Sequence, residues 1–335
     1  MSAIVNEHDS AGLWTLAWRR LREDRIAMAA LAVVAAFLVM LILSATGLVA
    51  ADWEDEVGVN YAPPTFVGAS AATLAAAGVA ATVPDNPFDP LAADIRALRG
   101  EGAATATPRR ATLPFGADKW GHDILKKTIR GGETSIIVGL VAALVAVGLG
   151  TLFGAISGFF GGIVDDLFNW FYSVFTSIPS ILMILTVAAV LQQKGVLTIV
   201  LILGLTGWTG PYRLIRAEYM RHKAREYVLA ADAIGASSWR KMFAHIFPNV
   251  SHVALVQLSI LAVGFIKAEV ILSFLGFGVP VGVVSWGSML NEAQNELLLG
   301  KWWQLTSAAV AMAVLVTAFS LLADALRDAL DPKVK

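Results

Sequence analysis

The stretch EYVLAADAIGASSWRKMFAHIFPN, residues 226–249, is a polar, basic segment between two long apolar runs. The rest of the chain is membrane-like, because 57% of its 335 residues are hydrophobic, 15% are charged and the mean hydropathy is +0.67. We expect an amphipathic insert in such a chain to contact a partner outside the lipid core. Residues 226–249 are therefore a candidate docking surface for a soluble protein.

Apolar runs near the roughly 20 residues needed to cross a bilayer core recur along the chain. Six runs approach or reach this length, at residues 26–50, 134–160, 167–191, 195–212, 249–275 and 304–323. The sequence predicts an all-α polytopic membrane protein with six transmembrane helices. The first run is too long for the core of a cleaved signal peptide, so we expect it to remain as a helix. The absence of cysteine excludes disulfides, thiolate metal sites and cysteine nucleophiles.

Lysine and arginine near the ends of the spans predict the orientation, because cytoplasmic loops carry an excess of them. One basic group precedes the first run and another lies between the fourth and fifth runs: Arg19, Arg20, Arg22 and Arg25, then Arg213, Arg216, Arg221, Lys223, Arg225, Arg240 and Lys241. We expect residues 1–25, residues 226–249 and the tail 325–335 to be cytoplasmic. The loop 51–133 is then outside despite its basic residues, since long loops translocate largely regardless of charge.

The predicted outer loop changes character along its length. Residues 51–114 are rich in Ala, Pro and Gly and favour irregular structure, with one short helix near residues 91–98. From Asp118 onward, apolar residues at helical spacing predict an interfacial helix that Gly131 and Gly132 end. This gives an extracytoplasmic segment at 51–130, followed by a transmembrane domain of five helices at 131–324.

Small and helix-breaking residues mark several predicted spans. Gly150, Gly154 and Gly158 lie four residues apart, share one helix face and favour close packing of another helix. Pro179 interrupts the third span and Gly207 the fourth. Such breaks are typical of helices that line a pathway, and also of helices that only kink.

Glu269 is the acidic residue predicted inside a span, with Lys267 nearby. A charge at this depth is costly, so it marks a candidate functional site on the translocation path. It lies about two turns from the predicted outer surface, where contact with water, a headgroup or a neighbouring helix explains it equally well. Both interpretations stay open.

Residues 226–249 read as two short helices. Tyr227 and Ile234 follow helical spacing, and Gly235 can adopt the positive φ that ends a helix. A serine can then cap a second helix with apolar residues on one face: Trp239, Met242, Phe243, Ile246 and Phe247. Docking to a protein and adsorption to the anionic inner leaflet both fit this pattern.

A family resemblance favours docking. Two alanines, a glycine four residues later and a proline thirteen residues after that resemble the coupling signature of bacterial ABC importer permeases, and are here Ala230, Ala231, Gly235 and Pro248. Flanking residues and further blocks resemble the C-type permease of the dipeptide, oligopeptide and nickel branch: FGAD at 115–118, GHD at 121–123, LSFLGFG at 272–278, SWG at 285–287 and LRDALDP at 326–332. Leu229 replaces the usual Glu, and Phe247 replaces the usual Leu.

The resemblance implies the type I ABC importer permease fold, with an extracytoplasmic insertion after the first helix, in the bacterial inner membrane. It also implies a second permease subunit, two cytoplasmic ATPase subunits that bind ATP and Mg, and an extracytoplasmic solute-binding protein. The chain itself is then no enzyme and needs no cofactor or metal, in keeping with its lack of a Walker phosphate-binding motif. The residues expected to dock the ATPase are Glu226, Tyr227, Ala230, Ala231, Asp232, Gly235, Ala236, Ser237, Trp239, Phe243 and Pro248.

The expected function is import of peptides or a related small solute. The alternative is a secondary transporter driven by an ion gradient. That class favours intramembrane carboxylates or inverted repeats, and the sequence has one such Glu and no convincing repeat. An intramembrane enzyme would need a nucleophile and base or a metal cluster within the spans, and none is visible.

Overall fold

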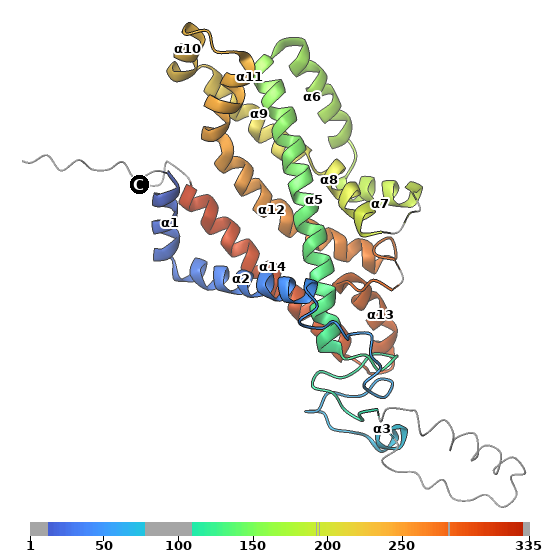
Figure 1. Cartoon of the computed structure of the whole chain (residues 1–335). Helices are drawn as coiled ribbons and strands as arrows, with labels where there is room; N and C mark the ends of the chain where they lie inside the picture. The colour runs from blue at the N-terminus through green and yellow to red at the C-terminus, as the bar shows by residue number, and fades with distance from the viewer. Residues whose placement is uncertain (1–12, 78–108, 192, 194, 281, 331–335) are drawn as a thin grey trace, which may run out of the picture.

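The computed structural model describes residues 13–77, 109–191, 193, 195–280 and 282–330 (Figure 1). These residues form helices joined by turns, with only isolated β-bridges. In chain order, the helices are α1 (Leu13–Glu23), α2 (Arg25–Ala45), α3 (Ala71–Ala76), α5 (Ile124–Phe160), α6 (Gly162–Thr176), α7 (Ser180–Leu191), α8 (Val196–Thr206), α9 (Thr209–Lys223), α10 (Glu226–Ala233), α11 (Ser238–Arg240), the π-helix η1 (Lys241–Ile246), α12 (Phe247–Phe274), α13 (Trp286–Leu298) and α14 (Trp303–Leu330). The short helix expected near residues 91–98 lies outside the described residues.

The described part of the chain contains four helical stretches long and apolar enough to span a membrane: α2, α5, the continuous stretch Ser238–Phe274, and α14. A fifth is present if α6 and α7 count as one span bent by 83°. The predicted count of six is not reached, because α8 has only 11 residues and the chain turns at Gly207 before α9. The ring of Phe265 explains this glycine, since an added Cβ at Gly207 would lie 2.3 Å from the Cζ atom.

The first span is shorter than expected and has a helix before it. α2 ends at Ala45 rather than at residue 50, because Gly47 takes a φ of +72° and the chain turns away. α1, which the sequence analysis left as a cytoplasmic segment, packs against α14, and its Ala17 shares a buried apolar cluster with Ala329 and Leu330 of the last turn of α14 and with Val256 of α12. The N-terminal helix α1 thus packs against the C-terminal end of α14.

The prediction of a separate interfacial helix ending at Gly131 and Gly132 is wrong. A single helix, α5, runs unbroken through both glycines. Their role is close packing, because an added Cβ at Gly132 would lie 2.8 Å from the indole of Trp286, and one at Gly131 would lie 3.1 Å from the backbone of Ser285. The glycine pair therefore allows the start of α13 to pack closely against α5.

The closest pairing in the fold is α5 against α9, which lie side by side in Figure 1. The predicted face of Gly150, Gly154 and Gly158 forms the contact, and an added Cβ at these positions would lie 2.5, 2.8 and 2.6 Å from backbone carbonyl oxygens of α9 and of Trp208, the residue that precedes it. Small residues allow this approach. Beside the contact, Arg216 of α9 donates two hydrogen bonds of 2.5 Å to Asp165, which ties α6 to the pair.

The two ends of α5 carry different structures. At one end, α10 and α11 project beyond the long helices (Figure 1). At the other end, residues 46–77 and 109–123 form a small lobe held by isolated β-bridges around the apolar core Val59, Ala62, Leu113 and Ala117. The indole N–H of Trp303 at the start of α14 donates to the carbonyl of Ala117 at 2.7 Å, which fixes the lobe to the helices.

We predict that Gly150→Ala destabilises the protein, because the new methyl group would meet the Trp208 carbonyl. Overpacking of this kind costs about 1–3 kcal/mol. Gly148→Ala is the matched control, since an added Cβ there has nothing within 4 Å, and removing a helix glycine there should stabilise by up to about 1 kcal/mol. Thermal unfolding of the purified protein in detergent measures both variants. Equal melting temperatures would contradict the close α5–α9 contact.

Candidate functional site

The segment 226–249 forms the projecting end of the fold. α10 ends at Ala233, and Gly235 has a φ of +81°, as expected for the glycine between two helices. Ser237 caps the next helix, its Oγ accepting from the N–H of Arg240 at 3.4 Å. This second helix is not separate, however, because α11 continues through η1 into α12. The projecting end is therefore built directly onto a membrane-spanning helix.

The π-helix η1 has a local cause in Pro248. Proline has no N–H and its ring clashes with the carbonyl four residues earlier, so a continuous helix must widen or kink before it. Here the chain widens, with Pro248 in the first turn of α12. The side-chain amide of Asn249 donates to the carbonyl of His245 at 2.8 Å and satisfies one backbone acceptor in the widened turn.

Apolar side chains are exposed on the outer surface of the segment. Trp239 and Phe243 stack with their ring planes 1° apart, and their exposed fractions are 56% and 41%. Ile234 is 85% exposed and Leu229 is 56% exposed. We call these four exposed residues, together with Tyr227, the tip patch. Phe243 also lines a groove beside α5. An apolar surface at the projecting end of a protein is typical of an interaction site.

The underside of the segment is packed into the fold. Val228 and Met242 are buried against Ile215 and Tyr219 of α9. The Tyr219 hydroxyl also donates to the carbonyl of Met242 at 3.1 Å. These contacts join α9, α10 and η1 into one packed unit.

The structure brings the predicted docking residues together on this end, with different exposures. Most of them are exposed: Glu226, Tyr227, Ala230, Asp232, Gly235, Ser237, Trp239, Phe243 and Pro248. Ala236 is half-buried and Ala231 is buried. Asp232 forms an ion pair with Lys241 across the turn. The sequence analysis did not place Leu229 and Ile234 among the residues expected to dock the ATPase. Two bulky apolar residues near a glycine turn in a polar segment could have indicated such a role.

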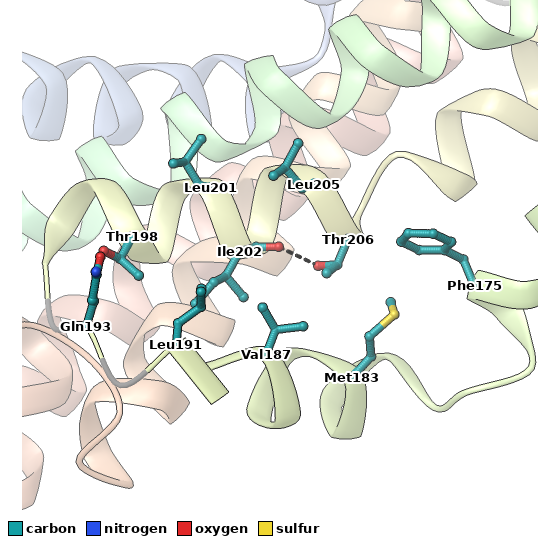
Figure 2. A pocket seen from close by; sticks show the side chains of 10 residues that line it. All are labelled: Phe175, Met183, Val187, Leu191, Gln193, Thr198, Leu201, Ile202, Leu205 and Thr206. Atoms are coloured by element: carbon teal, nitrogen blue, oxygen red, sulfur yellow. Dashed lines mark hydrogen bonds between the residues drawn. The ribbon is translucent and has the colours of Figure 1, made fainter. Parts of the chain in front are cut away.

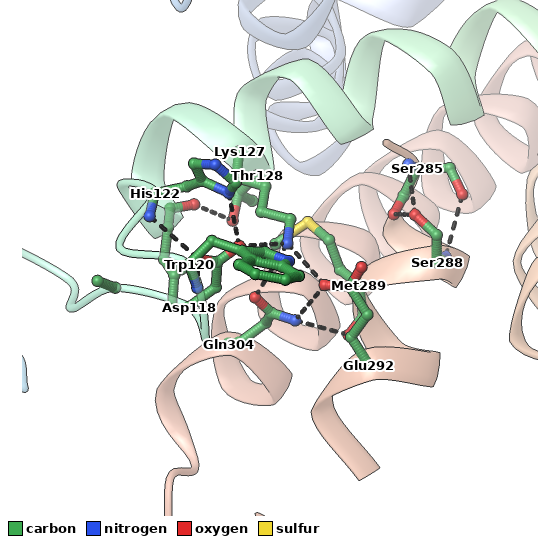
Figure 3. A network of polar contacts seen from close by, with 12 residues as sticks. Asp118, Trp120, His122, Lys127, Thr128, Ser285, Ser288, Met289, Glu292 and Gln304 are labelled. Carbon is green, nitrogen blue, oxygen red and sulfur yellow. Dashed lines mark hydrogen bonds and ion pairs between the residues drawn. The ribbon is translucent and has the colours of Figure 1, made fainter. Parts of the chain in front are cut away.

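A buried polar network forms at the opposite end of α5 (Figure 3). Lys127 Nζ lies 2.7 Å from Asp118 Oδ2 and 2.7 Å from Glu292 Oε2. The Oδ1 atom of Asp118 accepts backbone bonds of 2.8 and 3.0 Å from Trp120 and His122. Burial alone would raise the pKa of Asp118, but Lys127 and His122 hold it below its usual value. The network links the small lobe, α5 and α13.

Gln304 completes the network from α14. Its side-chain amide donates to the carbonyl of Met289 and to Glu292 Oε2, each at 3.2 Å. Lys127 Nζ lies 3.4 Å from Gln304 Oε1. Four parts of the chain therefore converge on one buried ammonium group.

Comparison with known proteins assigns the family. The family described as "Binding-protein-dependent transport system inner membrane component" matches residues 150–335, and the "N-terminal TM domain of oligopeptide transport permease C" matches residues 12–64. The chain belongs to the family of binding-protein-dependent ABC importer permeases. This confirms the resemblance and the type I permease fold, and gives no support to the secondary-transporter alternative.

Relatives of this permease carry related names. The dipeptide transport system permease protein DppC of Bacillus subtilis strain 168 is 35% identical over 68% of this chain and 71% of its own length. The oligopeptide permease OppC of the same organism is 36% identical over 66% of this chain and 72% of its own. DppC of Lactococcus lactis subsp. cremoris strain MG1363 is 31% identical over 95% of this chain and 90% of its own. The last match covers the small lobe as well as the helices.

Glu269 is enclosed in this conformation of the permease. Its side chain has no exposed surface, and Oε1 accepts a hydrogen bond of 2.6 Å from Ser273, while Oε2 has no partner within the described residues. Gly287 of α13 packs directly over this site, since an added Cβ would lie 2.5 Å from Ser273 Cβ. Glu269 therefore lies at the junction of α12 and α13, and its place on the translocation path stays a prediction.

A pocket lies between α7 and α8, and its lining residue Thr206 directly precedes the predicted break at Gly207 (Figure 2). The pocket has a volume of about 430 Å³ and is lined mainly by apolar side chains of α7 and α8, with Phe175 at the end of α6. Thr206 closes one side, and its hydroxyl donates to the Ile202 carbonyl at 2.7 Å. The two broken segments thus border an open apolar pocket in the membrane domain.

Glu296 of α13 is a second unpaired acid, next to the Lys127 network and outside the candidate spans. It is 2% exposed, and neither carboxylate oxygen has a hydrogen-bond partner in the described chain. Burial, with the carboxylates of Asp118 and Glu292, raises the pKa of Glu296 to about 7 against the opposing effect of Lys127. The acid therefore changes charge near neutral pH.

We predict that Glu296 makes the small-lobe end less stable as the pH rises. A folded pKa of about 7 against the ordinary glutamate value of 4.5 means that the folded protein binds more protons, so stability falls between these values and the loss is complete above pH 7. The shift corresponds to a few kcal/mol at most. In thermal unfolding and hydrogen exchange, Glu296→Gln should match the natural protein near pH 5 and exceed it at pH 8.5.

The control is Glu54→Gln, which removes an exposed carboxylate from the same lobe. Its stability should follow the pH dependence of the natural protein. Parallel pH curves for Glu296→Gln and the natural protein would show that Glu296 is not the titrating group.

Proposed function

We propose that this permease forms, with a second permease subunit, the path by which an ATP-driven importer carries peptides or a related small solute across the inner membrane. Two cytoplasmic ATPase subunits bind ATP and Mg, and the one beneath this chain docks on residues 226–249. An extracytoplasmic binding protein delivers the solute. The tip patch is the observation that carries the proposal, because it offers apolar area at the projecting end of the fold.

The chemistry of the tip patch favours a protein partner over the lipid surface. A protein cleft can bury the stacked rings of Trp239 and Phe243 together with the side chain of Ile234. Aromatic anchors of this kind dominate the energy of protein interfaces. The Asp232–Lys241 ion pair neutralises charge beside the patch, which reduces the cost of removing the surface from water.

Packing supports a mechanical role for the segment. Val228 and Met242 fix the underside to α9, and α9 is locked to α5 through glycines 150, 154 and 158. Closure of the ATPase subunits would then move α10, α9 and α5 as one body. Access to the path would switch between the two sides of the membrane as this body moves against its neighbours.

The proposed orientation places the tip patch and both chain ends in the cytoplasm and the small lobe outside. Basic residues near the tip patch support it: Arg213, Arg221, Lys223, Arg225 and Arg240 are all exposed at that end. The named relatives support peptides as the solute class, since they are called dipeptide and oligopeptide permeases. Glu269 remains a proposed contributor to the path, acting through the α12–α13 junction that encloses it.

We predict that Ile234→Ser weakens attachment of the ATPase. Loss of a buried apolar anchor typically costs 1–2 kcal/mol, or about a tenfold loss of affinity. Gly235→Val should act more strongly, because a β-branched residue is strained at a φ of +81°. Both variants should reach the membrane and fail in uptake. Co-purification of the ATPase with the tagged permease measures the effect.

Leu298→Ser is the matched control, because Leu298 is 86% exposed, as Ile234 is at 85%, but lies at the opposite end of the molecule. It should retain the ATPase fully. If Ile234→Ser and Gly235→Val also retain the ATPase and import normally, the docking assignment is wrong.

We predict opposite accessibility for two engineered cysteines. The natural chain has none, so Ser70→Cys in the small lobe and Ser237→Cys beside the tip patch each give one exposed thiol. A membrane-impermeant maleimide added to intact cells, with the outer membrane permeabilised where there is one, should label the first and spare the second until the inner membrane is opened. Labelling of Ser237→Cys alone in intact cells would reverse the proposed topology.

A further inference from the structure

An apolar groove lies between α2 and α5, close to the small-lobe end. It has a volume of about 260 Å³ and is lined by two helices of the membrane domain, with one residue each from α13 and α14. The residues that matter most for its shape are Ala36 and Leu41 of α2, Ile129 and Ile136 of α5, and Ala311 of α14. The groove therefore has an apolar wall on each side.

Two polar side chains of the groove lining, Thr128 and Glu133, are hydrogen-bonded to other residues of the chain. The Thr128 hydroxyl donates to the Ile124 carbonyl at 2.7 Å and lies 2.8 Å from the hydroxyl of Ser307. Glu133 Oε2 accepts from Ser44 at 2.6 Å and from Arg130 at 2.5 Å. An ordered water needs two to four polar partners. Beyond these two side chains and the Trp286 indole the lining is almost wholly apolar, so water is a poor occupant.

The rim of the groove is polar and carries the guanidinium group of Arg130, which forms an ion pair with Glu133 through Nη1. Ser44, Arg130 and Glu133 form one cluster at the end of α2, directly beyond Leu41. The Arg130 side chain is 38% exposed. Its described hydrogen bonds, to Glu133 and to the Ser44 carbonyl, both come from Nη1. Guanidinium groups bind phosphate oxygens well, and Nη2 and Nε retain donors for this purpose.

The groove has the dimensions of a lipid tail below a headgroup. From Ser44 at the rim to Ala36 is eight residues of α2, or about 12 Å along the helix. A whole helix, about 10–12 Å across, does not fit a space of 260 Å³. A single extended hydrocarbon chain does. α2 also exposes Leu38 and Val39 on its outer face, as expected for a helix in contact with lipid.

We infer that this groove binds one phospholipid, with an acyl chain between α2 and α5 and the phosphate at Arg130. The lipid belongs to the leaflet at the small-lobe end. The site does not depend on the proposed docking of the ATPase. The groove adjoins the contact between α13 and α5, because the Trp286 indole lines the groove and donates to the Thr128 carbonyl at 2.9 Å. A bound lipid fills the space between α2 and the site where α13 contacts α5.

The test uses the full-length permease with its partner subunits in nanodiscs that contain phosphatidylglycerol carrying a photoreactive diazirine. A diazirine near the carbonyl of the acyl chain should label peptides around Leu41 and Ile129. A diazirine at the chain end should label around Ala36 and Ile136. Peptide mass spectrometry reads the position. Absence of labelling in these segments, as expected if a side chain of the second permease fills the groove, would overturn the inference.

Variants separate the groove from the general lipid surface. Ala36→Trp and Ala311→Trp fill it from opposite walls, and either should reduce labelling at least fivefold. Leu38→Trp adds the same ring on the outer face of α2 and should leave labelling unchanged. Equal labelling in Ala36→Trp and Leu38→Trp would show nonspecific contact only and would overturn the inference.

Arg130→Gln tests the headgroup contact. It should reduce labelling by the phosphatidylglycerol probe several-fold while leaving labelling by a diazirine diacylglycerol, which has no phosphate, unchanged. An equal fall for both probes would show that Arg130 acts on the groove itself, and the assignment of the phosphate would be wrong.

Discussion

Backbone contact between α5 and α9 is the constraint on which the rest of the structure depends. At glycines 150, 154 and 158 the carbonyls of Trp208 and α9 lie where a side chain would otherwise be. Association in lipid has little hydrophobic driving force, so such close van der Waals contact holds helices together. Because α5 reaches from the small lobe to the tip patch, a helix fixed to it is placed relative to both ends. The Asp165–Arg216 pair extends that order to α6.

The two ends of this framework are held together by different interactions. At the small-lobe end, Lys127 gathers Asp118, Glu292 and Gln304 into a buried network that needs each element in place. At the other end the packing is apolar, and charges such as Asp232 and Lys241 remain near the surface. The Lys127 network fixes the relative positions of the elements at the small-lobe end. The other end exposes the tip patch on a tightly packed apolar base.

The sequence predicted the helical membrane class, the glycine face of α5 and the turn at Gly235, because each depends on local periodicity or on one backbone angle. It failed where distant residues decide. The sequence predicted a helix end at Gly131 and Gly132. The glycines are instead needed for close packing against Trp286, which lies far along the chain. Pro179 and Gly207 were predicted as breaks, but continuous hydropathy did not reveal the size of the bend, 83° between α6 and α7, or the division of the fourth run into α8 and α9. The Lys127 network was invisible because its four members come from separate segments.

The wide turn of η1 has a geometric consequence for the end that it carries. A π-turn contains one residue more than the α-turn that it replaces. In an α-helix each residue advances the chain by 1.5 Å and turns it by about 100°. Phe243 lies inside η1 and Trp239 precedes it. Gaining or losing a single wide turn would therefore rotate the chain before η1 by about 100° relative to α12, and would change the direction in which Trp239 faces.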